Sequence, residues 1–220
     1  MRSFLVTTPL KETWPSKDNK IVFLGDWCTL YDDKKFLNDY KYTISDYHWN
    51  DREKLKVDFD YLNQLFEKIL PSLASKFNKI HKVNYDTRYW KLILGPWLMV
   101  FLSISFDRWE SIRVCFKKFN IDKTIQLLLN EKDMTSICME DFSKKIETDE
   151  WNHYLFSEII NYINDEIEID KVYPNKVLTN KENEKQKSGF FNTLKSAFFS
   201  LTSFPAIYSK TFVYHSYLAR

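Results

Sequence analysis

Glycine is the residue whose scarcity most constrains what this chain can fold into. The sequence holds three glycines in 220 residues, Gly25, Gly95 and Gly189, and no two are close together. A dinucleotide-binding fingerprint or a phosphate-binding P-loop needs at least two glycines within about six residues. The sequence therefore excludes a self-contained Rossmann dinucleotide enzyme and a P-loop NTPase.

The balance of positive and negative residues argues against partners that bind through a large net charge on the protein. The chain carries 32 Lys and Arg against 30 Asp and Glu, a formal net charge of +2 at pH 7. A nearly neutral chain has no large single-sign field, so we expect that its net charge attracts neither nucleic acid nor anionic lipid. Aromatic residues make up 17% of the chain, which excludes intrinsic disorder and supplies apolar side chains for a core.

Cysteine usage and the apolar runs predict a soluble, cytoplasmic protein. The three cysteines, Cys28, Cys115 and Cys138, form no C-x-x-C pair, which favours free thiols over a disulfide framework or a zinc site. The N-terminus carries charges and no long apolar segment, so we expect no signal peptide. The longest apolar run, Pro96 to Ile104, is interrupted only by Ser103 and is shorter than the roughly 20 residues that span a bilayer.

Short apolar runs predict the strands of a parallel sheet. Residues 21–25 are continuously apolar and end at Gly25, a pattern typical of a strand buried on both faces. Asp26 and Trp27 follow at its carboxyl end, where open α/β sheets bind their ligands. We expect further strands at residues 40–44, 92–94 and 125–129, with a turn at Gly95.

Apolar residues at steps of three and four predict long helices between these strands. The clearest runs from Leu55 to Ile80, behind an N-cap and N3-Glu pattern at residues 50–53. A second is expected to start at Pro96 and continue to Phe119, and a third covers residues 149–163 with Thr148 as its cap. The sequence thus predicts a helix-rich α/β fold, with a Rossmann-like parallel sheet flanked by long helices.

The string Asp58-Phe59-Asp60 matches D-x-D, a metal-nucleotide signature of some transferases. On a helix, however, side chains two residues apart point about 200° away from each other and cannot share a metal ion. We interpret the two aspartates as surface carboxylates beside a core Phe59, and we expect no metal site.

Polar and aromatic residues gather at the ends of the predicted elements, the usual composition of a binding site. His48 is the candidate general base, because imidazole titrates near working pH. Asp26 or Asp51 could orient it, although a helix cap explains Asp51 equally well.

Indole faces suit sugar rings, and Asp and Arg supply directional hydrogen bonds. The candidate substrate-binding residues are Trp27, Trp49, Arg52, Arg88, Trp90, Gly95, Trp97, Asp107 and Arg108. Adjacent on a helix, Asp107 and Arg108 could also be separate polar groups satisfied by the backbone.

Several tryptophan-centred strings occur along the chain in a defined order. They are Thr7-Thr8 with Glu12-Thr13-Trp14, Phe23 through Cys28, Tyr47 through Lys54, Arg88-Tyr89-Trp90, Gly95-Pro96-Trp97, Phe106 through Trp109, and Asp149 through His153. Taken together they resemble a family of transferases encoded in bacterial lipopolysaccharide and surface-polysaccharide gene clusters. The resemblance runs from about residue 4 to about residue 165, and more weakly to the end.

The resemblance implies a two-domain glycosyltransferase of the GT-B type, with two Rossmann-like halves facing each other. In such enzymes the amino-terminal half holds the acceptor, the carboxyl-terminal half holds a nucleotide-sugar, and no bound metal or cofactor is needed. Residues 1–180 would be the acceptor-side α/β domain and residues 181–188 a linker or exposed loop. Residues 189–220 would form an aromatic helix and the first strand of a carboxyl-terminal domain that is missing here, in cis or in trans.

The expected function is therefore a glycosyltransferase-like step of surface-carbohydrate (lipopolysaccharide or O-antigen) synthesis. The expected partners are a nucleotide-sugar and a carbohydrate or glycolipid acceptor. The alternative is a non-catalytic carbohydrate-binding or scaffold module that acts with a partner chain. The Phe-rich residues 190–208 also suggest peripheral contact with the inner face of the cytoplasmic membrane, although a helix packed on the core explains them as well.

Overall fold

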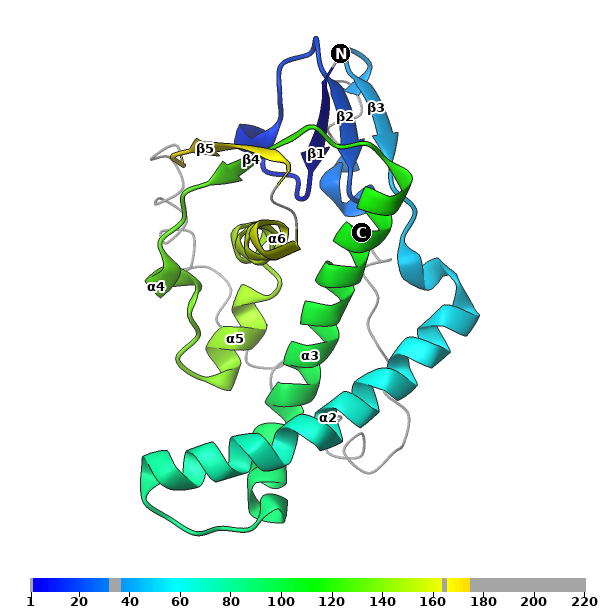
Figure 1. Ribbon diagram of the computed structural model, residues 1–220. Coiled ribbons are helices and arrows are strands. Elements are labelled where there is room, and N and C mark those ends of the chain that lie inside the picture. The colour runs from blue at the N-terminus through cyan, green and yellow to red at the C-terminus, as the bar shows by residue number, and fades with distance from the viewer. Residues whose placement is uncertain (1, 32–36, 164–165, 175–220) are drawn as a thin grey trace, which may run out of the picture. The chain divides into compact units, whose positions relative to one another are not determined.

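A computed structural model describes residues 2–31, 37–163 and 166–174 of the chain (Figure 1). All of these residues belong to one compact unit, Met1–Pro174. The predicted linker at residues 181–188 and the predicted helix and strand in residues 189–220 lie outside the described residues. The predicted domain boundaries therefore stay predictions.

A five-stranded, all-parallel sheet forms the centre of this unit, in the order β3-β2-β1-β4-β5 (Figure 1). Its strands are β1 (Ser3–Val6), β2 (Lys20–Phe23), β3 (Lys41–Ile44), β4 (Lys123–Leu127) and β5 (Glu168–Val172). The order reverses direction between β1 and β4, as in doubly wound sheets. The predicted α/β, Rossmann-like fold class is confirmed.

Three of the predicted strands, at residues 21–25, 40–44 and 125–129, correspond to β2, β3 and β4. Strand β2 is buried on both faces, as its continuous apolar run predicted, because Ile21, Val22 and Phe23 are at most 1% exposed. The short β1 and the exposed edge strand β5 were not predicted. One connection departs from the usual pattern, since a single 3-10 turn, η1 (Lys11–Thr13), takes the place of a crossover helix between β1 and β2.

Two long helices and a shorter one supply most of the remaining structure. They are α2 (Arg52–His81), α3 (Thr87–Lys118) and α6 (Asp149–Ile163), with the short helices α4 (Glu131–Met134) and α5 (Met139–Lys145) between β4 and α6. The carboxyl-terminal half of α3 and all of α6 pack against the sheet (Figure 1). The core formed there includes Leu5, Val22, Ile112, Phe156 and Ile160.

Helices α2 and α3 form an antiparallel hairpin with its own apolar seam. Leu62, Phe66 and Leu70 of α2 pack against Leu98 and Leu102 of α3. The cap of α2 is one residue later than the predicted pattern placed it. The Asp51 carboxylate accepts hydrogen bonds from the amides of Glu53 and Lys54, at 3.0 and 3.1 Å. Thr148 caps α6 as predicted, since its hydroxyl accepts from the amide of Trp151.

The predicted strand at residues 92–94 and the predicted turn at Gly95 are wrong. Both lie inside α3, which starts at Thr87, nine residues before the predicted start at Pro96. The Asp86 carboxylate caps this start by accepting a hydrogen bond from the amide of Tyr89. Pro96 is tolerated inside the helix because it lies on an exposed side. The carbonyl it deprives of a donor is that of Leu92, a residue that is 75% exposed, so water can reach it.

Helix α3 is long and apolar enough to cross a membrane by length and composition, and it is the one such helix among the described residues. Its most apolar window has a mean hydropathy of 1.4, and 22% of that window is buried. A core helix of a soluble protein passes the same test when it is mostly buried, and one helix of this kind is weak evidence for a membrane span. The fully buried residues Ile112 and Cys115 lie in the carboxyl-terminal half of α3, beyond its most apolar part.

Substitution of Gly25 tests the packing beside β2, and substitution of Gly95 in α3 serves as the comparison. A Cβ atom at Gly25 would meet the Trp27 ring at 2.2 Å, whereas a Cβ atom at Gly95 would meet only ordinary contacts, 3.6 Å from Phe66. We expect Gly25→Ala to lower the free energy of unfolding by about 1–3 kcal/mol through overpacking. Gly95→Ala, inside α3, should raise it by up to about 1 kcal/mol, because alanine favours helix. Urea unfolding of both variants measures this, and equal effects of the two substitutions would contradict it.

Candidate functional site

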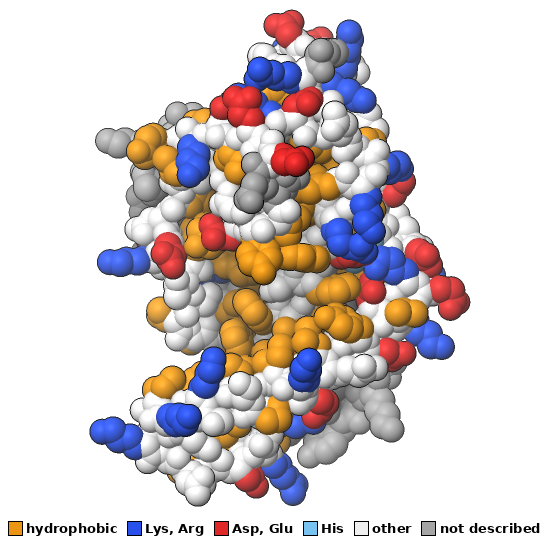
Figure 2. Space-filling view, viewed as in Figure 1, with side chains coloured by type: hydrophobic (Ala, Val, Ile, Leu, Met, Phe, Trp, Pro, Cys, Tyr) orange, Lys and Arg blue, Asp and Glu red, His pale blue; other side chains and the backbone are white. Residues whose placement is uncertain are grey.

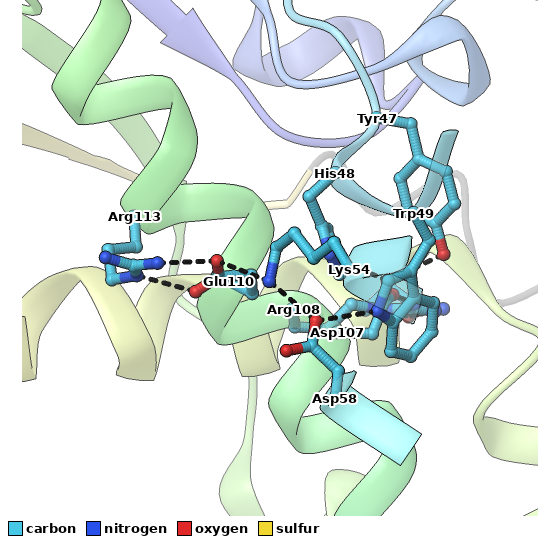
Figure 3. Close-up of polar contacts among 10 residues, drawn as sticks. Tyr47, His48, Trp49, Lys54, Asp58, Asp107, Arg108, Glu110 and Arg113 are labelled. Carbon is cyan, nitrogen blue, oxygen red and sulfur yellow. Dashed lines mark hydrogen bonds and ion pairs between the residues drawn. The ribbon is translucent and has the colours of Figure 1, made fainter. Parts of the chain in front are cut away.

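A cluster of polar and aromatic side chains lies beyond the carboxyl ends of β1, β2 and β3 (Figure 3). The segments that follow these strands contribute Thr7, Trp27, Tyr47 and His48, and the middle of α3 contributes Asp107. Trp27 is tied to the end of β1, because its Nε1 donates to the carbonyl oxygen of Thr7 at 3.0 Å. The cluster thus lies at the edge of the sheet where open α/β folds bind their ligands.

The carboxylate of Asp107 is the centre of this cluster. It is 4% exposed and accepts hydrogen bonds from the hydroxyl of Tyr47, at 2.8 Å, and from Nε2 of His48, at 3.0 Å. Its second oxygen pairs with the guanidinium of Arg108. The carboxylate that His48 contacts is therefore Asp107, rather than Asp26 or Asp51.

These partners keep Asp107 ionised in a buried position. Burial alone would raise the pKa of its carboxyl group. The hydrogen bond from His48, the charge of Arg108 and the hydrogen bond from Tyr47 outweigh burial and lower the pKa below its ordinary value. Asp107 is thus a permanent acceptor and a fixed negative charge at neutral pH.

His48 is oriented by Asp107 and leaves one ring nitrogen unused. Its side chain is 1% exposed, and Nδ1 has no hydrogen-bond partner among the described residues. Because Nε2 faces a carboxylate, the neutral ring carries its proton on Nε2 and has a lone pair on Nδ1. A buried polar atom without a partner costs free energy, so such atoms are uncommon outside functional sites.

Arg108 connects the cluster to the start of α6. Its Nε and Nη2 both donate to the side-chain oxygen of Asn152, at 3.0 and 2.8 Å. The amide nitrogen of Asn152 donates in turn to the carbonyl oxygens of Ile146 and Thr148, which fixes which way the amide points. With Nη1 on Asp107, these bonds use three of the five N–H groups of Arg108. Two donors remain for an anionic ligand.

Aromatic rings surround His48. The rings of Tyr47 and Trp49 lie 5.0 and 4.7 Å from the imidazole, centroid to centroid. Trp27 meets Tyr47 edge to face at 5.9 Å, and Trp49 stacks on Phe106 at 6.3 Å. Figure 2 shows apolar side chains on the walls of a hollow between α2 and the side of α5 and α6.

A second histidine, His153, closes the junction between β1 and β4, where the order of the sheet reverses. Its Nε2 accepts from the amide of Leu127, at 3.0 Å, so the ring proton is on Nδ1, which faces the hydroxyl of Thr7 at 3.3 Å. Burial lowers the pKa of His153 to about 4. His153 is therefore a neutral structural residue at the point where ligands of doubly wound sheets usually bind.

A separate ion cluster joins α2 to α3 beside the site (Figure 3). Lys54 bridges Asp58 at 2.6 Å and Glu110 at 3.0 Å, and Arg113 contacts Glu110 through two 2.6 Å bonds. Burial opposes the charge on Glu110, but the bonds from Arg113 and Lys54 prevail and lower its pKa to about 2. The interpretation of the D-x-D string as two surface carboxylates beside a core phenylalanine is wrong for two of its residues. Asp58 is buried and accepts from Nε1 of Trp49, Phe59 is 51% exposed, and only Asp60 is exposed as expected.

The structure brings together only part of the predicted set. Trp27, Trp49, Asp107 and Arg108 lie with His48, and Asp26 is exposed in the 3-10 turn η2 (Asp26–Cys28), which follows β2. Asp51 and Arg52 are exposed at the start of α2. The other four lie along the hairpin, away from His48: Arg88, Trp90, Gly95 and Trp97. There Trp90 donates to the Asn78 side chain at 2.8 Å, Gly95 faces Phe66, and Trp97 stacks on Phe101.

Sequence reasoning did not select Tyr47, Asn152 or Thr7. Each was present in a string of interest, but its role depends on a contact across a long sequence separation, such as the 44 residues between Arg108 and Asn152. A polar residue beside a tryptophan in the first turn of an amphipathic helix was the one available signal for Asn152. Among the described residues, no group of three His, Cys, Asp or Glu side chains could hold a metal ion.

The buried His153 makes the stability of the fold depend on pH. Its pKa is about 4 in the folded chain against an ordinary 6.5, so below pH 6.5 the unfolded chain binds a proton that the folded chain does not. Stability is therefore lost as pH falls from 6.5 towards 4, by up to about 1.4 kcal/mol per pH unit. We expect His153→Gln to have a shallower dependence in urea unfolding over this range. Parallel pH dependences of the two proteins would contradict the assignment.

Comparison with known proteins places the chain in a family. Residues 3–220 match the family model described as LIC12162 family transferase. No curated protein and no solved structure matches the chain. Because the match covers nearly all of the sequence, the chain belongs to the LIC12162 family of transferases.

Proposed function

We propose that this transferase moves a glycosyl group from a nucleotide-sugar to a hydroxyl of a carbohydrate or glycolipid acceptor. The observation that carries the proposal is the buried pair of His48 and Asp107, in which Nδ1 of the imidazole has a lone pair and no partner among the described residues. An imidazole held by a carboxylate is a common general base for activating a hydroxyl.

The proposed step uses the residues as follows. The hydroxyl proton of the acceptor passes to Nδ1 of His48 while the acceptor oxygen bonds to the anomeric carbon of the donor. The bond from that carbon to the phosphate oxygen breaks, and the nucleotide leaves with the electron pair. Asp107 stabilises the imidazolium that forms, and the free N–H groups of Arg108 bind a phosphate or carboxylate group.

Access to His48 requires a movement of neighbouring rings. The side chain is 1% exposed and lies against Tyr47 and Trp49, so an acceptor reaches Nδ1 only when one of these rings shifts. Tyr47 is held by Asp107 and Trp49 by Asp58. Displaced rings would remain beside the substrate, where aromatic faces can stack on a sugar.

The wider context is part of the same proposal. The chain would act as the acceptor-side half of a GT-B glycosyltransferase in bacterial lipopolysaccharide or O-antigen synthesis, without a bound metal. It would work in the cytoplasm, peripheral to the membrane through residues 190–208. A carboxyl-terminal domain, in cis or in trans, would hold the donor. The resemblance of the tryptophan-centred strings supports this context.

Substitutions of the central pair test the proposal. We expect His48→Ala and Asp107→Asn to lower kcat for glycosyl transfer by about 10²- to 10⁴-fold, because each removes the oriented base. KM for the donor should change little. Transfer is measured by product formation from a panel of labelled nucleotide-sugars, with the carboxyl-terminal half supplied where it is separate. Asp60→Asn, an exposed carboxylate on α2, is the control and should keep the rate.

Two outcomes would overturn the proposal. Unchanged transfer by His48→Ala, with an unchanged unfolding midpoint, would remove His48 from the mechanism. Binding of carbohydrate without transfer from any donor would instead favour the non-catalytic binding module.

A further inference from the structure

The far end of the α2–α3 hairpin, residues 76–93, exposes an unusual amount of apolar surface. Ile80 is 70% exposed, Leu92 is 75% exposed and Ile93 is 52% exposed. Tyr85 and Tyr89 are 46% and 39% exposed, with ring centroids 4.1 Å apart. Scattered single apolar residues are normal on a surface, but several large ones within one short segment mark an interaction surface.

Three of these side chains share one face of α3. Tyr89, Leu92 and Ile93 are separated by three and four positions at the start of α3, so they point to the same side. The Tyr85 ring continues this stripe into the connection between the helices. We refer to residues 76–93 as the hairpin end.

Hydrogen bonds from one side chain, that of Asn78, fix the conformation of the hairpin end and so keep its exposed apolar side chains at the surface. The Asn78 side chain accepts from the amide of Tyr85, at 3.1 Å, and donates to the carbonyl oxygen of the same residue, at 2.8 Å. It also accepts from Nε1 of the buried Trp90, at 2.8 Å. The amide of Val83 donates to the carbonyl of Asn78. One asparagine thereby joins both helices and the turn between them.

The charge of the hairpin end is strongly positive. It contains five basic residues, Lys76, Lys79, Lys82, Arg88 and Lys91, against one acidic residue, Asp86. Asp86 is the cap of α3, and Lys91 is paired with Glu67. Because the whole chain carries only +2, the remainder is net negative and the positive charge is concentrated here. Figure 2 shows Lys and Arg side chains projecting from this end, the lower left of Figure 1.

We propose that the hairpin end docks on an anionic lipid surface. Leu92, Ile93 and Ile80 would enter the acyl boundary, the two tyrosines would lie at the level of the headgroups, and the lysines would contact lipid phosphates. The concentrated positive charge favours an anionic membrane over an apolar protein partner. This surface is independent of the proposed glycosyl transfer and of residues 190–208.

Vesicle flotation of the full chain tests the proposal. The probes are phosphatidylcholine vesicles with and without phosphatidylglycerol. We expect binding to the anionic vesicles that weakens with added salt, and a loss of at least about tenfold in the bound fraction for Leu92→Ser with Ile93→Ser. Lys79→Glu with Lys82→Glu should lose binding by a similar factor. Ile137→Ser, at a site 91% exposed between α4 and α5, is the matched control and should float like the original chain.

Other results would overturn the proposal. These are no flotation of the original chain, equal losses in the Ile137→Ser control, or unchanged flotation of both double variants. If Phe198→Ser with Phe199→Ser alone removes binding, residues 190–208 are the membrane contact instead. If the Leu92 and Ile93 variant abolishes a concentration-dependent dimer while no form floats, the surface joins two copies of the chain. An unchanged unfolding midpoint in each variant excludes loss of the fold as the cause.

Discussion

A single buried carboxylate, that of Asp107, determines how the parts around the site are arranged. Removing an unpaired carboxylate from water costs several kcal/mol, so its burial depends on the donors that surround it. These come from Tyr47 and His48 in the segment between β3 and α2, and from Arg108 beside it on α3. Arg108 extends the same network to Asn152 at the start of α6. One charge thus fixes the relative positions of three segments that are distant in the sequence.

The position of α6 then decides which part of the sheet edge can be functional. His153 fills the junction of β1 and β4 with two hydrogen bonds and stays neutral, so the usual crevice of a doubly wound sheet is closed by protein. His48, whose Nδ1 has no partner among the described residues, lies on the other side of β1, in the segment that follows β3. This displacement agrees with the absence of a glycine-rich phosphate loop, since no phosphate needs to approach the backbone at the junction.

The fold class was predictable, whereas the site was predictable only in part. Buried strands such as β2 and amphipathic helices such as α6 carry local patterns that the sequence displays directly. The strand predicted at residues 92–94 is wrong because a three-residue apolar run before Gly95 and Pro96 has the local pattern of a strand and a turn. In the structure α3 continues through these residues, on an exposed side. His48, Asp107 and Arg108 were recognised as candidates, but the pairing of His48 with Asp107 spans 59 residues and has no local signature. Arg88 and Trp90 lie in a string with the same mixture of polar and aromatic residues as the string around His48. The helix nevertheless places them at the far end of the hairpin.

The α2–α3 hairpin also has a consequence for the order of folding. Strand β4 must pair with β1 across more than a hundred residues, and closing so long a loop in a flexible chain is entropically costly and slow. The hairpin can form locally, because its turn and apolar seam use neighbouring residues. Its two outer ends then lie close together, as the Lys54 to Glu110 bond shows. Once it forms, the 78 residues between β3 and β4 act as a short connection, so the hairpin would nucleate closure of the sheet.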